Sequence, residues 1–314
     1  MNIAFGPVPS RRLGRSLGVN NIPPKSCTYS CLYCQVGITV DKASVPRHFY
    51  EPEAIRAAVE SQLEKACVAN EAVDYLTFVP DGEPALDINL GKAIELLKPL
   101  GVPIAIISNA SLLWLPEVQA AFAKADWVSV KVDSVDEDVW RALNRPHEAL
   151  RLPEILSGIR QFAGDFAGEL VTETMLVEAV NDAPEHVGKT ARYIRSLPVA
   201  TAYLAVPTRP PGEPGIKGPT EGVMTAAYQE FAACVPQAEY LIGYEGDAFA
   251  FTGDVSQDLL SITAVHPMRE SAVRTLIQRG GANWTLVEQL IANGQLVETQ
   301  YQGEHFYIRH FSRP

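Results

Sequence analysis

Short apolar segments alternate with helical patterns over most of this 314-residue chain, and this alternation constrains the fold more than any other feature. Residues 53–66 carry apolar side chains at Ile55, Val59 and Leu63, which is the spacing of one helix face. Residues 73–79 then form a short apolar run that is typical of a buried strand. Strands and helices that alternate in this way predict βα units around a parallel sheet.

The alternation continues to residue 234. We expect further strands at 103–107, 127–132, 170–177 and 200–206, and helices at 90–97, 116–124, 152–162, 184–196 and 224–234. With one strand before residue 27 counted as the first, the pattern gives six repeats, too few to close an eight-fold barrel. Active residues of such sheets gather at the carboxyl ends of the strands.

The composition is that of an ordinary globular protein, with 47% hydrophobic and 20% charged residues. No apolar run approaches the ~20 residues that span a bilayer, and the N-terminus lacks a basic region followed by an apolar stretch, so we expect no membrane segment and no signal peptide. The five cysteines form no evident disulfide framework, which favours a reducing cytoplasm. The net charge of −11 disfavours a nucleic acid partner, because polyanions are bound mainly through basic surfaces.

Three cysteines, Cys27, Cys31 and Cys34, stand in a C-x3-C-x2-C pattern. A cubane iron–sulfur cluster takes one soft thiolate on each iron, so three thiolates leave one iron open for a substrate or cofactor. Zinc sites more often show C-x2-C pairs with a fourth ligand close by, and the nearest histidine is His48. The pattern favours an iron–sulfur cluster, with a zinc site or three incidental thiols as the alternatives.

The spacing, with the aromatic Tyr33 before the last cysteine, resembles that of the radical S-adenosylmethionine (SAM) enzymes. The resemblance covers roughly residues 1–210 and implies an α/β fold with a partial (β/α)6 barrel. It also implies a [4Fe-4S] cluster on Cys27, Cys31 and Cys34, with SAM bound to the open iron. In that family, one electron cleaves SAM to a 5′-deoxyadenosyl radical, which abstracts a substrate hydrogen. The resemblance implies an electron donor, such as flavodoxin or ferredoxin, as a partner.

The tripeptide Gly82-Glu83-Pro84 matches the end of the family's G-G-E-P type motif, so the resemblance implies that Gly82 and Glu83 hold the amino group of SAM. A carboxylate suits an ammonium group, and a glycine permits close backbone approach. The chain departs from the motif at Asp81, where the family usually has a small residue. After the next predicted strand, Asn109 either faces SAM or substrate, or caps a helix.

Charged residues also mark the later strand ends. Lys131 and Asp133 alternate onto one face of their strand, and buried charges there need partners. The resemblance implies that this strand end contacts SAM, with Asp133 as an acceptor for the ribose and Lys131 as a partner for the carboxylate. On the fifth strand, Glu173 and Met175 share a face and are candidates for pocket lining. Arg209 lies in a Pro/Gly-rich segment that we expect to cover the barrel mouth.

Two further segments narrow the resemblance. Residues 6–12 and 140–147 look like those of the branch that includes the wybutosine-pathway tRNA enzymes, which carry a second cluster. Only Cys67 and Cys234 remain here, too few for a second three-thiolate set, so we do not expect that reaction. We expect residues 6–21 to form an ordered loop that leads into the first strand.

The chain is expected to have two domains, a partial barrel at 1–250 and a small winged-helix-like domain at 256–314. The C-terminal pattern gives helices at 268–278 and 285–293, then a hairpin formed by 296–299 and 306–309. Positive and negative charges balance in this unit, which favours a scaffold, peptide-docking or dimer role over nucleic acid binding.

The sequence therefore predicts a single-cluster radical SAM enzyme whose substrate is an RNA base, a peptide residue or a small metabolite. The alternative from another class is an iron–sulfur redox sensor or regulator with a winged-helix output domain. A third interpretation is an activase that places its radical on a partner protein. A cradle for SAM separates the enzyme from the sensor, because a sensor does not need one.

Overall fold

The computed structural model describes residues 2–310. Within them, one large sheet contains the strands β1 (Ala4–Ser10), β2 (Gly14–Val19), β5 (Tyr75–Phe78), β6 (Ile104–Ser108), β7 (Trp127–Lys131), β8 (Glu169–Met175), β9 (Thr201–Ala205) and β10 (Ala238–Leu241). Its helices are α1 (Pro52–Val68), α2 (Leu90–Leu97), α3 (Pro116–Phe122), α4 (Glu137–Asn144), α5 (Leu152–Asp165), α6 (Pro184–Arg195) and α7 (Glu221–Cys234), with short 3₁₀ turns η1 (Pro84–Leu86) and η2 (Lys98–Leu100).

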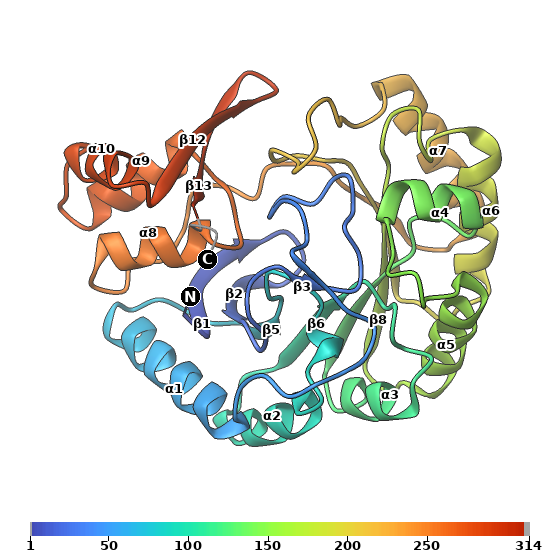
Figure 1. Cartoon of the computed structure of the whole chain (residues 1–314), viewed down its shortest axis with the longest axis horizontal. Helices are drawn as coiled ribbons and strands as arrows, with labels where there is room; N and C mark the ends of the chain where they lie inside the picture. The colour runs from blue at the N-terminus through green and yellow to red at the C-terminus, as the bar shows by residue number, and fades with distance from the viewer. Residues whose placement is uncertain (1, 311–314) are drawn as a thin grey trace.

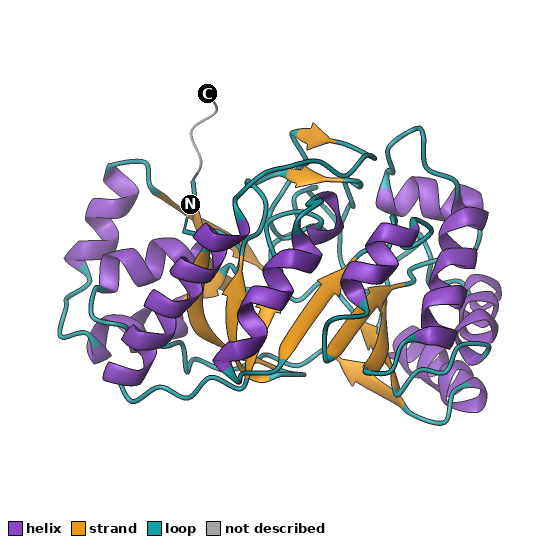
Figure 2. Cartoon of the chain, turned by 90° about the horizontal axis from the view of Figure 1, so that it is seen from below, coloured by secondary structure: helices purple, strands orange, loops and turns teal. Residues whose placement is uncertain are grey.

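The sheet has the order β1-β2-β5-β6-β7-β8-β9-β10 among the described residues. Neighbouring strands from β2 to β10 pair in parallel, and β1 pairs antiparallel with β2. The sheet curves, and the helices form an arc around its outer side (Figure 1). Seen from below, the strands lie inside the helical layer (Figure 2). This arrangement confirms the predicted α/β fold with a partial barrel.

Local sequence explains where several helices begin. A proline occupies the first turn of four of them, where its missing N–H leaves no hydrogen bond unmade and its fixed φ suits the helix. These residues are Pro52 in α1, Pro116 in α3, Pro153 in α5 and Pro184 in α6. The predicted helices therefore begin close to their expected residues.

Several elements differ from the sequence-based expectation, among them helix α8 (Val255–Thr263), which the predicted pattern does not contain. The expected loop at residues 6–21 is instead a hairpin of β1 and β2, with a bulge between Phe5 and Val8. Helix α4 and strand β10 were not predicted. Strand β10 lies at the edge of the sheet, and two of its four residues, Glu239 and Tyr240, are exposed, so it lacks the apolar run that marks the inner strands.

The C-terminal unit packs beside the N-terminal edge of the sheet (Figure 1). It contains α8 (Val255–Thr263), β11 (Met268–Arg269), α9 (Glu270–Arg279), α10 (Thr285–Ala292), β12 (Leu296–Tyr301) and β13 (Glu304–Arg309). The strands form a separate sheet of order β11-β13-β12. Phe5 and Val8 of β1 belong to the hydrophobic core of this unit. The winged-helix assignment and the boundary between 1–250 and 256–314 stay predictions, and residues 311–314 lie outside the described part.

Among residues 2–310, no helix is both long enough and apolar enough to cross a bilayer.

Two glycines of α5 provide a test of the packing between this helix and the segment before α3. A Cβ at Gly158 would lie 2.4 Å from the backbone nitrogen of Trp114, whereas a Cβ at Gly164 would meet nothing within 4 Å. Gly164→Ala should raise the free energy of unfolding by roughly 0.5–1 kcal/mol, because alanine is the better helix former. Gly158→Ala should lower it by about 1–3 kcal/mol, because backbone atoms cannot move aside. Urea denaturation of both variants measures this, and equal effects would contradict the close helix approach.

Candidate active site at the carboxyl edge of the barrel

The main cavity lies at the carboxyl ends of the parallel strands and has a volume of about 340 Å³, within the range of small-molecule sites. All three predicted cluster cysteines line it, as do Gly82 and Lys131. The cavity therefore brings together residues that follow β2 and β5 with the last residue of β7.

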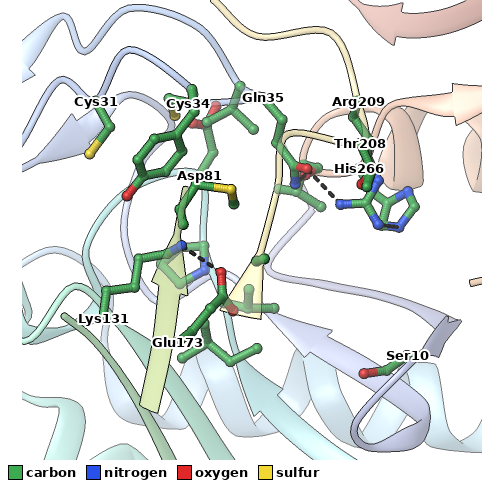
Figure 3. Close-up of a pocket in the computed structure, with 18 of the residues that line it drawn as sticks. Ser10, Cys31, Cys34, Gln35, Asp81, Lys131, Glu173, Thr208, Arg209 and His266 are labelled. Carbon is green, nitrogen blue, oxygen red and sulfur yellow. Dashed lines mark hydrogen bonds and ion pairs between the residues drawn. The ribbon is translucent and has the colours of Figure 1, made fainter. Parts of the chain in front are cut away.

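The cavity has two ends, which Figure 3 shows. Cys31 and Cys34 lie on one side, and Arg209 and His266 lie on the other. The first side is formed by the loop after β2, and the second by the loop after β9 and by the segment between α8 and β11.

The cysteines lie in residues 25–42, which we call the cysteine loop and which includes β3 (Ser26–Cys27) and β4 (Asp41–Lys42). The end of α4 holds this loop through its backbone. The N–H of Ser30 donates to the carbonyl of Asn144 at 3.0 Å, and the N–H of Leu32 donates to the carbonyl of Leu143 at 2.9 Å. Helix α4 therefore positions the cysteines, although it contributes no cysteine itself.

Two side-chain amides donate to cysteine sulfurs. The Nδ2 of Asn109 lies 3.6 Å from Cys27 Sγ, and the Nδ2 of Asn144 lies 3.3 Å from Cys31 Sγ. Such hydrogen bonds stabilise negative charge on sulfur, and in iron–sulfur proteins they help to set the reduction potential. Asn109 was predicted as a site residue, whereas Asn144 was not, although it lies in the segment 140–147 that narrowed the resemblance.

The thiols themselves are free, and burial raises the pKa of each of them. The pKa of Cys31 reaches about 12, through burial first and then through the charges of Cys34 and Asp133. A coordinated metal deprotonates a thiol outright, so these groups need a strongly positive partner to act as thiolates.

The three thiols fit an iron–sulfur cluster by their chemistry. In residues 2–310, no group of three or more His, Cys, Asp or Glu side chains is arranged to hold a single metal ion. A cubane places each thiolate on a different iron, so its ligands stand farther apart than those of one ion. Soft sulfur donors on a single loop, with amide donors behind Cys27 and Cys31, are consistent with such a cluster.

Gly82 allows the end of β5 to approach the cysteine loop closely. A Cβ at this position would lie 1.8 Å from the carbonyl oxygen of Ser26, and the next residue, Glu83, donates its N–H to the same oxygen at 3.0 Å. Any side chain at Gly82 would therefore push the residues after β5 away from Ser26, which precedes Cys27 in the cysteine loop.

The side chain of Glu83 is hydrogen-bonded to other residues of the protein. Its Oε1 accepts from the hydroxyl of Ser108 at 2.6 Å and from the N–H of Ala85 at 3.0 Å, and its Oε2 accepts from the N–H of Asn109 at 2.8 Å. The side chain is buried and does not line the main cavity. Burial raises the pKa of Glu83 to about 7, although these hydrogen bonds oppose the shift. Glu83 thus joins the end of β5 to the end of β6.

Asn109 is part of a turn after β6. Its Oδ1 accepts from the N–H of Ser111 at 3.0 Å, and its Nδ2 donates to Thr28 Oγ1 at 2.7 Å as well as to Cys27. The next helix begins only at Pro116, so the alternative of a helix cap at Asn109 is wrong.

Lys131 and Glu173 both line the cavity, and they form a buried ion pair at 2.6 Å. Arg12, from the turn between β1 and β2, pairs with the other oxygen of Glu173 at 2.7 Å. Burial alone raises the pKa of Glu173, but Lys131 and Arg12 outweigh it and hold the pKa at about 2. Met175, the other predicted lining residue of β8, also contacts the cavity.

Asp133 does not line the main cavity. It borders a separate small pocket of about 20 Å³, and its Oδ1 accepts from the N–H of Met175 at 2.8 Å. Its Oδ2 accepts from the hydroxyl of Tyr33 and, at 2.8 Å, from Nδ2 of Asn144. Asp133 lies two residues beyond the end of β7, so its side chain no longer follows the strand alternation that the sequence suggested.

Asp81 is a site residue that the sequence analysis treated only as a departure from a motif. Its side chain is 1% exposed and lines the cavity beside Gly82. Neither carboxylate oxygen accepts a hydrogen bond, and Lys25 Nζ lies 3.4 Å from Oδ2. Burial raises the pKa of Asp81 to about 6, and Lys25 opposes the shift. The sequence did contain a signal for this residue, because an acidic residue stands at Asp81 where the motif usually has a small one.

A second group lies at the far end of the cavity, and of its residues the sequence analysis had singled out only Arg209. Glu245 pairs with Arg209 at 2.8 Å and with His266 at 3.0 Å, and Arg209 also donates to Gln35 Oε1 at 2.6 Å. Gln35 follows Cys34 and donates to the carbonyl of Val265 at 3.0 Å. No motif marks these positions, because they come from irregular segments far apart in the sequence.

The comparisons with known proteins agree with this geometry. Residues 21–187 match the radical SAM superfamily, and the chain belongs to that superfamily. It is similar to a UPF0026 protein of Methanocaldococcus jannaschii, with 45% identity over 311 residues that cover 98% of this chain and 96% of that protein. The protein is therefore an enzyme of the radical SAM class.

Solved structures support the fold. A radical SAM methyltransferase from Sphaerobacter thermophilus matches with a TM-score of 0.55 and 16% identity, over 72% of this chain and 66% of that chain. SuiB of Streptococcus suis, solved bound to S-adenosylmethionine, matches with a TM-score of 0.52 and 13% identity, over 71% of this chain and 49% of that chain. The chain thus spans about two thirds of the first protein and about half of the second.

The buried pairing of Glu173 predicts a specific pH dependence. Because its pKa is lowered in the folded state, the pairing stabilises the protein above the unfolded pKa near 4.5 and loses this effect as the pH falls toward 2. Glu173→Gln should lower the free energy of unfolding by about 3–5 kcal/mol at pH 7, since it leaves buried cations unpaired. In urea denaturation, the difference from the native chain should shrink between pH 5 and pH 3.

Glu169→Gln is the matched control, because Glu169 lies on the same strand but is exposed. Its effect should stay below about 1 kcal/mol. A loss for Glu173→Gln that does not change with pH would contradict the ionic role of Glu173.

Proposed function

We propose that this enzyme reductively cleaves SAM and uses the resulting radical to abstract a hydrogen atom from a substrate. The observation that carries the proposal is the convergence of Cys27, Cys31 and Cys34 with Asp81 and Gly82 in one cavity at the strand ends. A redox sensor needs the cysteines but has no use for a cavity of ligand size beside them.

The cysteine loop supplies three thiolates for a [4Fe-4S] cluster. A cluster held there would supply the one electron that reductive cleavage of SAM to a 5′-deoxyadenosyl radical requires. Asn109 and Asn144 hold the Sγ atoms of Cys27 and Cys31 through their amide donors and stabilise the thiolate form of both. A small electron-transfer protein, such as a flavodoxin or ferredoxin, is the proposed electron donor.

The cradle for the SAM amino group is proposed at the end of β5. Gly82 keeps the backbone close to the cysteine loop, and Asp81 presents a buried carboxylate that accepts no hydrogen bond from the protein. An ammonium group would satisfy these oxygens with charge-assisted hydrogen bonds. The oxygens of Glu83 already accept three hydrogen bonds, through which this residue connects the ends of β5 and β6.

Lys131 and Asp133 take different proposed roles. Lys131 Nζ has three donors and lines the cavity, so it retains donors for the carboxylate of SAM beyond the one that it gives to Glu173. Asp133 is proposed as a positioning residue, because its oxygens accept from Tyr33, Asn144 and the backbone.

A reducing cytoplasm is the proposed setting. All five cysteines are free, and Cys67 is exposed, so the chain has no disulfide that requires an oxidising compartment.

Formation of 5′-deoxyadenosine tests the proposed reaction. Anaerobically reconstituted protein, given SAM and dithionite, should produce it, and single Cys27→Ala, Cys31→Ala or Cys34→Ala variants should not, because each removes a cluster ligand. Cys67→Ala is the matched control, since this thiol is exposed on α1, and it should keep the native rate. Liquid chromatography with mass spectrometry measures the product.

Absence of 5′-deoxyadenosine from native protein that carries its cluster would contradict the proposed reaction and favour the redox sensor. Addition of total small RNA separates substrate classes in the same assay. An increase with RNA would indicate an RNA base as substrate, whereas an unchanged rate would favour a smaller molecule.

SAM affinity separates Asp81 from Glu83 as the partner of the ammonium group. Asp81→Asn should raise the dissociation constant for SAM about 10- to 100-fold, which corresponds to loss of a charge-assisted hydrogen bond. Glu83→Gln should mainly lower the free energy of unfolding, because it leaves donors of the β5–β6 junction without an acceptor. Equilibrium dialysis of reconstituted protein measures the affinity, and urea denaturation measures the stability. The reverse result, with SAM affinity lost only in Glu83→Gln, would assign the ammonium group to Glu83.

A further inference from the structure

The main cavity is more cationic than the chain that encloses it. The whole chain has a net charge of −11, yet the cavity is lined by five cationic side chains and three carboxylates. The cations are Arg11, Arg12, Lys25, Lys131 and Arg209, and the carboxylates are Asp81, Glu173 and Glu245. Such a local excess is not expected from the composition and indicates a function for positive charge in the cavity.

Each carboxylate in the cavity already has a cationic partner. Glu173 pairs with Arg12 and Lys131, Asp81 lies beside Lys25, and Glu245 pairs with Arg209. Among residues 2–310, no ion pair joins Arg11 to a carboxylate. Arg11 is therefore the lining cation whose charge the protein does not neutralise directly.

The fold holds the Arg11 guanidinium in a defined place. Its Nη1 donates to the carbonyl of Leu241 at 2.6 Å and to the carbonyl of Gly243 at 2.8 Å. Arg11 lies in the turn between β1 and β2, and Leu241 ends β10, so these bonds connect the two opposite edges of the sheet. Nη2 and Nε make no hydrogen bond with the described residues and remain available as donors.

Arg11 is surrounded by groups of both charges. Burial and the charge of Arg209 lower the pKa of Arg11, the charges of Glu245 and Glu173 raise it, and a guanidinium stays protonated at neutral pH. Arg11 and Arg209 line the same cavity, and a guanidinium with free N–H donors suits a carboxylate or a phosphate. This end of the cavity also contains His266, whose buried Nδ1 has no hydrogen-bond partner.

The cofactors of the proposed function would not neutralise this charge. A [4Fe-4S] cluster with three thiolates carries a net negative charge and SAM carries a net positive one, so together they cancel. They also belong to the cysteine side of the cavity, and Figure 3 shows Arg209 and His266 on the opposite side. The end near Arg209 is therefore left for the substrate.

We propose that Arg11 binds a carboxylate or phosphate group of a small anionic substrate at the end of the cavity lined by Arg209 and His266. The inference rests on the proposed function, because it treats the space beyond the cysteine side as the substrate site. A small molecule fits better than RNA, because a polynucleotide needs an extended basic surface and this protein is acidic overall.

Isothermal titration calorimetry of the reconstituted, SAM-loaded, oxidised enzyme tests the anion site. Inorganic phosphate and malonate serve as separate probes for a phosphate and for a carboxylate, with sodium chloride at matched ionic strength as the background. We expect at least one probe to bind one site per chain, and Arg11→Gln to weaken this binding at least about 10-fold. Arg195→Gln, on the exposed end of α6, is the matched control and should bind as the native chain does.

A second measurement on the native chain keeps the test valid if Arg11→Gln fails to fold. The bound probe should protect Arg11 from an arginine-selective dicarbonyl reagent, as peptide mapping by mass spectrometry measures. Failure of both probes to bind above the chloride background, or equal binding by Arg11→Gln, would overturn the anion site. Equal modification of Arg11 with and without probe would overturn it as well.

The outcomes also separate this inference from the proposed function. If 5′-deoxyadenosine forms but neither anion binds, the reaction stands and the anionic substrate is wrong. If an anion binds at Arg11 but no 5′-deoxyadenosine forms, the site stands and the reaction is wrong.

Discussion

The buried carboxylate of Asp133 fixes the cysteine loop to the barrel, and the geometry of the site depends on it. Asp133 accepts hydrogen bonds from Tyr33 in the loop, from Asn144 at the end of α4 and from the backbone of Met175 at the end of β8. Asn144 in turn donates to the sulfur of Cys31. Because these groups come from separate parts of the chain, the cysteines reach their places only when β7, α4 and β8 are packed together. Formation of the barrel and formation of the cluster site are therefore coupled.

The buried carboxylates around the cavity divide into two kinds. Glu83, Asp133 and Glu173 have their oxygens occupied by protein donors, and they hold together the ends of strands that the sheet alone would leave unconnected. Asp81 differs from these, because Lys25 lies beside it at 3.4 Å but neither of its oxygens accepts a hydrogen bond from the described residues. The first three carboxylates stabilise the protein itself, whereas Asp81 keeps acceptor oxygens available to a ligand. The same contrast distinguishes Arg12, which is paired with Glu173, from Arg11, which donates only to carbonyls.

Much of the barrel and part of the site could be predicted from the sequence. Strands β5 to β9 are buried apolar runs, so their positions follow from composition within about two residues, and the spacing of Cys27, Cys31 and Cys34 marks the metal site. The β1–β2 hairpin was missed because its glycines, prolines and arginines look like a loop. The roles of Glu83 and Asp133 were harder to predict from the sequence. The direction of a side chain beyond a strand end depends on distant partners such as Ser108 and Tyr33. Arg209, Glu245 and His266 meet only through irregular segments, for which no periodicity exists.

We propose that the cysteine loop holds a cluster with one iron that SAM can bind. Electron paramagnetic resonance of the dithionite-reduced, reconstituted protein tests it directly, with spectra recorded before and after addition of SAM. We expect the signal of a reduced [4Fe-4S] cluster whose g-values change when SAM is added, because SAM would alter the coordination of the open iron. A cluster signal that SAM leaves unchanged at saturating concentration would contradict it, and so would a cluster that survives replacement of Cys34 by alanine.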